Sequence, residues 1–142
     1  MKIEINRLND AVHLQAVNED GNTISMDGAP TIGGINAGFR PMQLLLAGLG
    51  GCSSVDLIDI LKKQRQDLRD IKITIDGDRE KQAAPALFTD IRMHFRLYGS
   101  LDKQKVERAL DLSVNKYCSV GKILEKTARI SYTYEIIDNQ DI

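Results

Sequence analysis

The strongest constraint on the fold is the stretch 41–65, which reads as one long helix with almost no polar side. It begins at Pro41, and proline suits the first turn of a helix because its missing N–H would have no partner there. A helix that is apolar nearly all round is a buried one. Gly48, Gly50 and Gly51 interrupt it, although each glycine disfavours a helix by about 1 kcal/mol relative to alanine. We therefore expect another backbone to approach the helix closely at these glycines.

A helix of this length is too long for one small chain to surround. About 24 helical residues span roughly 36 Å. A compact domain of 142 residues has a radius of gyration of about 14 Å, so its diameter is close to the length of the helix. Part of the apolar helix surface is then left for a second copy of the chain. We therefore predict a homodimer, the simplest symmetric assembly.

Composition and charge narrow the class of protein. The length of 142 residues suits a single domain, 1–142, with a core of its own. A net charge of −1 at pH 7 gives no electrostatic footprint for nucleic acid or an anionic membrane. Asp56 and Asp59 interrupt the apolar part of the helix and argue against a membrane span. We expect a cytoplasmic protein whose two cysteines are thiols or a redox pair, not a structural disulfide.

The N-terminal part of the chain alternates polar and apolar residues at the two-residue period of strands. Three short strands separated by turns are expected within 2–27. The glycine-rich stretch 28–40 lacks the residues of a phosphate-binding loop and is interpreted as a surface loop that leads into the helix and covers a site. His13 here and His94 in a later strand fall on polar faces, and we expect both to be solvated.

The part of the chain after the long helix predicts two more strands, two helices and a last strand. Alternation at 71–75 and 91–97 indicates a hairpin. Ser100 and Ser119 are expected to cap the two helices, and the last strand covers 130–136. The order β-β-β-α-β-β-α-α-β, with one polar face per strand, predicts an α+β fold of antiparallel sheets covered by helices.

Cys52 follows the glycines directly, in the middle of the predicted helix. Free cysteine is among the most buried residue types, so core packing is one interpretation. A reactive thiol is the other, and it requires a nearby cation, histidine or helix N-terminus. Asp56 and Asp59 lie on the helix face of Cys52, at i+4 and i+7, and would oppose a thiolate. The positive charge must come from elsewhere, and Arg40, just before the helix, is the nearest in sequence.

Cys118 lies at the junction of the last two predicted helices, one residue before Ser119. A position just outside a helix N-terminus favours negative charge, although a buried junction residue fits the same place. A disulfide with Cys52 would need Cα atoms roughly 4.4–6.8 Å apart, which sequence does not reveal. A metal site from Cys52, Asp56 and Cys118 is a weaker alternative, because the chain has no zinc-type spacing of ligands.

The run Arg40-Pro-Met-Gln-Leu-Leu-Leu-Ala-Gly-Leu-Gly-Gly-Cys52 resembles the central helix of the OsmC/Ohr family, the osmotically inducible and organic-hydroperoxide-resistance proteins. Cys118, in Tyr117-Cys118-Ser-Val, stands where that family places its second cysteine. The order of elements and the length also match over nearly the whole chain.

This resemblance implies an OsmC-like intertwined homodimer in which antiparallel sheets wrap around two long central helices, with two sites at the interface. In characterised members the first cysteine attacks a hydroperoxide and becomes a sulfenic acid. The second cysteine condenses with it to a disulfide, which a dithiol reductant reopens. These roles fall on Cys52 and Cys118, and no cofactor is implied besides the external dithiol reductant.

Two positions depart from the active peroxidases of this family. Those proteins carry a glutamate directly after the proline that starts the helix, where this chain has Met42. They also use an N-terminal arginine to hold the thiolate. No arginine stands between Leu8 and Phe39, which leaves Arg7 and Arg40. We assign the role to Arg40, and the chain is closer to the OsmC-like branch with Pro-Met before the helix.

Two functions and a structural alternative remain at this point. The first function is thiol-dependent, peroxiredoxin-like reduction of organic hydroperoxides or hydrogen peroxide in oxidative or osmotic stress defence. The second is a catalytically weak relative that binds a small apolar or thiol ligand in the interface pocket, whose entrance Met42 makes more apolar. In the third interpretation both thiols are structural and the protein serves only in assembly.

Overall fold

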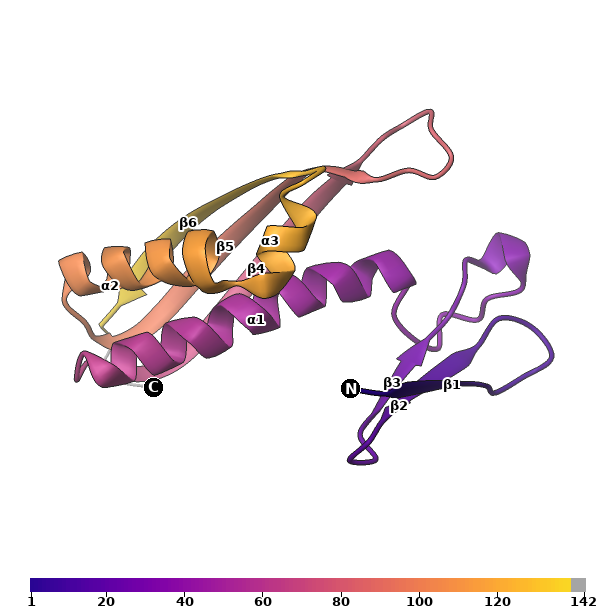
Figure 1. The fold of residues 1–142 in the computed structure, drawn as a ribbon, viewed down its shortest axis with the longest axis horizontal. Coiled ribbons are helices and arrows are strands. Elements are labelled where there is room, and N and C mark those ends of the chain that lie inside the picture. Colours follow the sequence, from indigo (N-terminus) through magenta and orange to yellow (C-terminus); the bar gives the residue numbers. More distant parts are fainter. Residues whose placement is uncertain (139–142) are drawn as a thin grey trace. The chain divides into compact units, whose positions relative to one another are not determined.

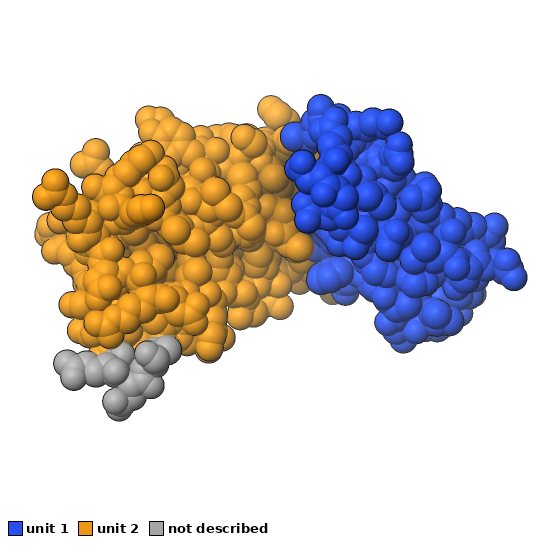
Figure 2. Space-filling model, turned by 90° about the horizontal axis from the view of Figure 1, so that it is seen from below, with its two compact units in different colours: residues 1–45 blue, residues 46–142 orange. Residues whose placement is uncertain are grey.

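The computed structural model describes residues 1–138, and contacts divide the chain into two compact units. Unit 1 comprises residues 1–45 and unit 2 comprises residues 46–142 (Figure 2). The element order β1-β2-β3-α1-β4-β5-α2-α3-β6 (Figure 1) agrees with the order that the sequence predicts. A short 3₁₀ turn in the glycine-rich loop and a π-helical segment before α3 are additions to it.

Unit 1 contains a three-stranded antiparallel sheet in the order β1-β2-β3. Its strands are β1 (Ile3–Arg7), β2 (Leu14–Asn18) and β3 (Thr23–Met26). The register places Ile5 opposite Ala16 and Ala16 opposite Ile24, so one face of the sheet is apolar. Within residues 1–45, all of which the structure describes, Asp27 is the only buried residue. The apolar face of this sheet is therefore not covered within unit 1.

Helix α1 (Pro41–Lys63) is the predicted long helix, two residues shorter than the stretch 41–65. It ends because Arg65 adopts the left-handed conformation, with φ of 56°, and the Gln66 N–H then bonds back to the Leu61 carbonyl over 2.9 Å. This arrangement is a usual helix stop. Four of its fully buried residues follow one another at a spacing of four along the helix, which places them in one row: Leu49, Ser53, Leu57 and Leu61.

Unit 2 contains a second three-stranded sheet in the order β4-β5-β6. Its strands are β4 (Asp67–Arg79), β5 (Phe88–Ser100) and β6 (Arg129–Ile137). The predicted hairpin is confirmed, since β4 and β5 pair antiparallel. The antiparallel prediction is wrong for β6, which runs parallel to β5. The reason is the helical connection between β5 and β6, because a crossover of this kind returns the chain to the sheet in its original direction.

The connection between β5 and β6 consists of α2 (Lys103–Leu110), the π-helical segment η2 (Asp111–Tyr117) and α3 (Ser119–Leu124). The sequence assigned the cap of α2 to Ser100, but this residue still belongs to β5. Asp102 is the cap, and its carboxylate accepts a hydrogen bond of 2.9 Å from the Lys105 N–H.

The core of unit 2 lies between the sheet and its helices, which share one face of the sheet (Figure 1). The strand β5 supplies alternate side chains to this core, and α2 supplies a matching stripe. The fully buried members are Ile91, Phe95, Leu97, Val106, Ala109 and Leu110.

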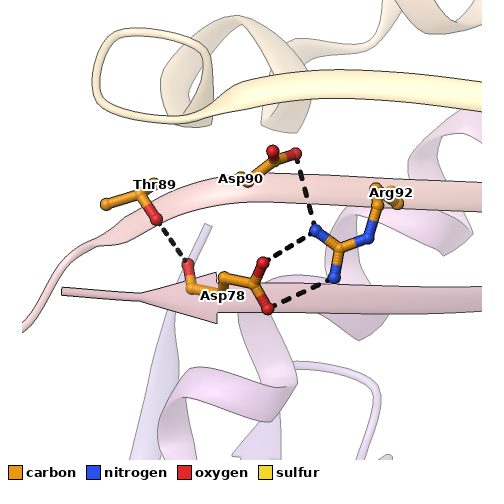
Figure 3. A network of polar contacts seen from close by, with 4 residues as sticks. All are labelled: Asp78, Thr89, Asp90 and Arg92. Atoms are coloured by element: carbon orange, nitrogen blue, oxygen red, sulfur yellow. Dashed lines mark hydrogen bonds and ion pairs between the residues drawn. The ribbon is translucent and has the colours of Figure 1, made fainter. Parts of the chain in front are cut away.

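The opposite face of the sheet is polar and carries an ion-pair network at one end of the hairpin (Figure 3). Arg92 binds both carboxylate oxygens of Asp78, over 2.8 and 3.2 Å, and lies 3.7 Å from Asp90. The hydroxyl of Thr89 donates to the Asp78 carbonyl over 3.2 Å. The Arg92 guanidinium lowers the pKa of Asp78. All these groups face water, where such pairs contribute little to stability, so the network marks the solvated face.

The apolar character of α1 fits both a membrane-spanning helix and the core helix of a soluble protein. By length and composition alone the helix could cross a membrane, so Asp56 and Asp59 do not exclude a span as the sequence argument assumed. The core helix of a soluble protein passes the same test. Leu49, Leu57 and Leu61 are 0% exposed, so one row of α1 belongs to the core of unit 2, whereas only 28% of its apolar stretch is buried in the single chain.

Gly48 and Gly50 of α1 meet side chains of this chain, not a backbone as the sequence led us to expect. A Cβ atom on Gly50 would lie 2.6 Å from the Cδ1 atom of Ile75 in β4. A Cβ on Gly51 would meet nothing within 4 Å. Of the three glycines, Gly50 thus lies closest to the sheet, and Gly51 faces away from it.

Replacing Gly50 by leucine therefore tests the contact between α1 and β4. We expect Gly50→Leu to lower the free energy of unfolding by about 1–3 kcal/mol, since overpacking a filled core forces strained side chains. The double variant Gly50→Leu, Ile75→Ala makes room for the new side chain and should recover part of this loss. Urea unfolding measures both. If the double variant loses as much free energy of unfolding as Gly50→Leu and Ile75→Ala do together, the two residues are not in contact.

Candidate active site

Cys118 is fully buried at the point where η2 gives way to α3. The sequence assigned the cap of α3 to Ser119, but this residue is already the first of the helix. Cys118 itself is the cap, with extended backbone angles, and its Sγ accepts a hydrogen bond of 3.2 Å from the Gly121 N–H. The backbone thus directs a helix N–H group at the sulfur.

The sulfur of Cys118 also contacts the central helix. The hydroxyl of Ser53 donates to Cys118 Sγ over 3.5 Å. The Cys118 thiol in turn donates to the carbonyl oxygen of Leu49, one turn earlier on α1, over 4.0 Å. Ser53 and Leu49 are both fully buried, so these contacts form inside the core of unit 2.

Cys52 precedes Ser53 on α1 and is half-buried. Its side chain is close enough to Cys118 to raise the pKa of that thiol, and both residues are free thiols. The structure therefore brings together the two cysteines that the sequence selected from different elements. The Cys52 thiol is partly open to solvent, whereas the Cys118 thiol is enclosed.

The surroundings of Cys118 act on its pKa in opposite directions. Burial is the largest effect and raises the pKa, because a thiolate loses its hydration there. The hydrogen bonds from Ser53 and Gly121 lower it, and the neighbouring Cys52 raises it again. None of these causes is a cation. The pKa of Cys118 depends on burial, on the two neutral donors and on the neighbouring Cys52 thiol.

Arg40, the third predicted site residue, belongs to unit 1. Its guanidinium donates to the Asn36 side-chain oxygen over 2.8 Å and to the Asp27 carbonyl over 3.4 Å. These contacts hold the arginine within the loop that precedes α1. Its predicted role beside Cys52 stays a prediction.

Asp27 is a residue that the sequence reasoning missed. It is 2% exposed, and its carboxylate accepts hydrogen bonds of 2.8 to 3.0 Å from the backbone N–H groups of Gly28, Ile35 and Ala37. Hydrogen bonds to the charged form lower the pKa of Asp27. One carboxylate thus organises the glycine-rich loop, and an aspartate at the start of such a loop was the signal that could have indicated it.

Ser53 is the second residue that the sequence reasoning missed. Its signal was present, because a serine at position 53 interrupts a row of leucines at 49, 57 and 61. A polar residue in a buried row needs a hydrogen-bond partner, and only the fold shows that the partner is the sulfur of Cys118.

The remaining candidates do not form a site of their own. Asp59 pairs with Lys63 over 2.6 Å on the exposed side of α1. His13 bonds Ser25 and His94 bonds Thr133, each over 2.7 Å. Residues 1–138 contain no group of three histidine, cysteine, aspartate or glutamate side chains that could hold a metal ion, so the alternative metal site does not form there.

A family model and a relative of known sequence both match most of this chain. The sequence model described as OsmC-like protein matches residues 33–133. Protein YhfA of Escherichia coli (strain K12) is 41% identical over 121 residues, which cover 82% of this chain and 84% of YhfA.

Solved structures share the fold over nearly the full chain. A hypothetical protein from Aquifex aeolicus VF5 is 29% identical with a TM-score of 0.84, covering 98% of this chain and 97% of that one. An organic hydroperoxide resistance protein OsmC from Legionella pneumophila, also described as a predicted redox protein, has a TM-score of 0.70 at 14% identity. That comparison covers 95% of this chain and 97% of the Legionella chain.

The Asp27 carboxylate gives the loop a defined dependence on pH. Because its pKa is lowered in the fold, its contribution is fully present above the ordinary value of 3.8 and is lost as the pH falls through the lowered value. The Ile35 and Ala37 amides should therefore stay protected from hydrogen exchange between pH 5 and pH 7. Asp27→Asn should remove most of this protection at pH 7, as NMR can measure. Asp20→Asn, an exposed aspartate in the same unit, is the control, and equal exchange in both variants would contradict the assignment.

Proposed function

The chain belongs to the OsmC-like protein family, and we propose that it is a thiol-dependent peroxidase that reduces organic hydroperoxides or hydrogen peroxide through Cys52 and Cys118. The observation that carries this proposal is the pair of free thiols, one half-buried and one enclosed, in which the hydroxyl of Ser53, the residue next to Cys52, lies 3.5 Å from Cys118 Sγ. The name of the Legionella structure, an organic hydroperoxide resistance protein, supports the substrate class.

The proposed reaction assigns a different step to each cysteine. Cys52 is the thiol that an oxidant reaches, because it is half-buried whereas Cys118 is enclosed. The Cys52 thiolate attacks the distal oxygen of a hydroperoxide, the O–O bond breaks, and the leaving alkoxide takes up a proton to become an alcohol. Cys52 becomes a sulfenic acid. The Cys118 thiol then condenses with it, so that a disulfide forms and water leaves.

An external dithiol closes the cycle by thiol–disulfide exchange, which restores both thiols and oxidises the dithiol. A cytoplasmic location fits this cycle, since that compartment keeps thiols reduced. We assign the positive charge that favours the Cys52 thiolate to Arg40, whose guanidinium the Asn36 side chain and the Asp27 carbonyl hold in the loop before α1. The reaction needs no metal and no bound cofactor.

We further propose that the protein acts as a homodimer, because the single chain leaves too much apolar surface uncovered. On α1, Val55 is 68% exposed and Ile58 is 42% exposed. In unit 1, Ile3, Ile5 and Phe39 are each at least half exposed. Exposed apolar surface of this kind usually marks an interface.

A second candidate function is binding of a small apolar or thiol ligand by a catalytically weak protein. Met42 supports it, because this position holds a glutamate in the active peroxidases that the sequence resembles. Mass spectrometry of a denatured extract of the purified protein would reveal a ligand that copurifies. A clean extract together with rapid peroxide turnover would reject this candidate.

Peroxide reduction is tested by stopped-flow measurement of thiol loss with cumene hydroperoxide. We expect the wild type to react faster than free cysteine, and Cys52→Ser to react no faster than free cysteine. Cys118→Ser should still form a sulfenic acid, which dimedone traps on Cys52, but it should not form the disulfide. A wild type no faster than free cysteine would reject the peroxidase proposal.

The oligomeric state is tested by sedimentation velocity. We expect the wild type to sediment at twice the mass of one chain. Val55→Asp should raise the dissociation constant more than about 100-fold, because an uncompensated buried charge destabilises by about 3–5 kcal/mol. Asp78→Asn, an exposed carboxylate on the polar face of the sheet in unit 2, should leave the dimer intact. A monomeric wild type would contradict the proposal.

A further inference from the structure

One polar residue stands in the buried row of the central helix. Leu49, Ser53, Leu57 and Leu61 follow one another at a spacing of four, and each is 0% exposed. A leucine or alanine at position 53 would continue this row without a buried hydroxyl. A buried hydroxyl is unfavourable unless it is hydrogen-bonded, so the serine needs a reason that packing does not supply.

The hydrogen bond of Ser53 differs from those of the other helical serines in this part of the chain. A serine inside a helix commonly bonds back to a carbonyl of its own helix. Ser54 does so with the Gly50 carbonyl, and Ser113 does so with the Leu110 carbonyl. The Ser53 hydroxyl instead leaves its helix and donates to Cys118 Sγ over 3.5 Å.

The sulfur of Cys118 is held from two elements at once. Ser53 donates to it from α1, and the Gly121 N–H donates from the start of α3 over 3.2 Å. Cys52, the residue next to Ser53, is the titratable group that acts on this sulfur. Ser53 therefore donates a hydrogen bond to the sulfur of Cys118 and directly follows Cys52 in the sequence.

We propose that Ser53 is a positioning residue for the resolving step: it orients the sulfur of Cys118 and donates a hydrogen bond to it during the attack on oxidised Cys52. The inference rests on the proposed function. In this step the Cys118–Cys52 S–S bond forms and the S–O bond of the sulfenic acid breaks. The departing hydroxide takes up the proton that Cys118 loses, and it leaves as water.

The environment of Cys118 explains why the resolving step depends on a hydrogen-bond donor. Burial raises the pKa of Cys118, whereas the hydrogen bond from Ser53 lowers it. Removing the hydroxyl should raise this pKa further and reduce the thiolate fraction at neutral pH. The more basic thiolate is more nucleophilic, but this gain offsets only about half of the loss on a logarithmic scale, so disulfide formation slows.

The test separates the two chemical steps in Ser53→Ala. Trapping with dimedone measures sulfenic acid formation at Cys52, which should stay within about twofold of the wild type because Ser53 contacts Cys118 and not the peroxide. Disulfide formation should slow about threefold at neutral pH, and its pH midpoint should move to higher pH. Ser54→Ala is the matched control, since it removes a hydroxyl that bonds only within α1. A Ser53→Ala variant with unchanged disulfide formation and an unchanged pH midpoint would overturn the proposal.

A second measurement works without turnover and detects a variant that is merely misfolded. In the Cys52→Ser background Cys118 is the only thiol, so thiolate absorbance at 240 nm follows its titration. Ser53→Ala should move this titration to higher pH, whereas Ser53→Thr, which keeps the hydroxyl, should restore it. Equal titrations in all three backgrounds would overturn the proposal. Absence of sulfenic acid in the wild type would instead reject the peroxidase function, and with it the resolving step.

Discussion

The contact between the sulfur of Cys118 and helix α1 is the interaction on which the rest of the account depends. It joins the central helix to the start of α3, and it forms because Ser53 lies in the buried row of α1 and Cys118 caps α3. The same contact places Cys52 beside Cys118. The proposed redox chemistry between the two residues requires this proximity, and both are free thiols in the structure.

Sequence reasoning predicted the features that local pattern determines. The long helix, the order of the strands and the selection of both cysteines follow from periodicity, from proline and glycine, and from family resemblance. The caps were misassigned: Asp102 and Cys118 cap α2 and α3, in place of Ser100 and Ser119. Several side chains near each helix start can act as a cap, and the tertiary path of the chain decides among them.

The remaining features depend on contacts between distant segments. The parallel pairing of β6 with β5 follows from the crossover through α2 and α3, which no single strand pattern records. The roles of Asp27 and Ser53 depend on partners that lie 1 to 10 and 65 residues away in sequence. Both are buried polar groups whose purpose is visible only when the groups they bind are known. The uncovered apolar residues of α1 and unit 1 likewise point beyond the single chain.

The central claim is that Cys52 and Cys118 form one redox pair. The most direct measurement is peptide mapping by mass spectrometry after the reduced protein has reacted with one equivalent of cumene hydroperoxide and been digested without reductant. The account predicts a linked pair of peptides joined through Cys52 and Cys118, lighter by two hydrogen atoms than the sum of the reduced peptides and absent before oxidation. Cys52 left unmodified, or oxidised to a sulfinic acid while Cys118 stays a free thiol, would contradict it.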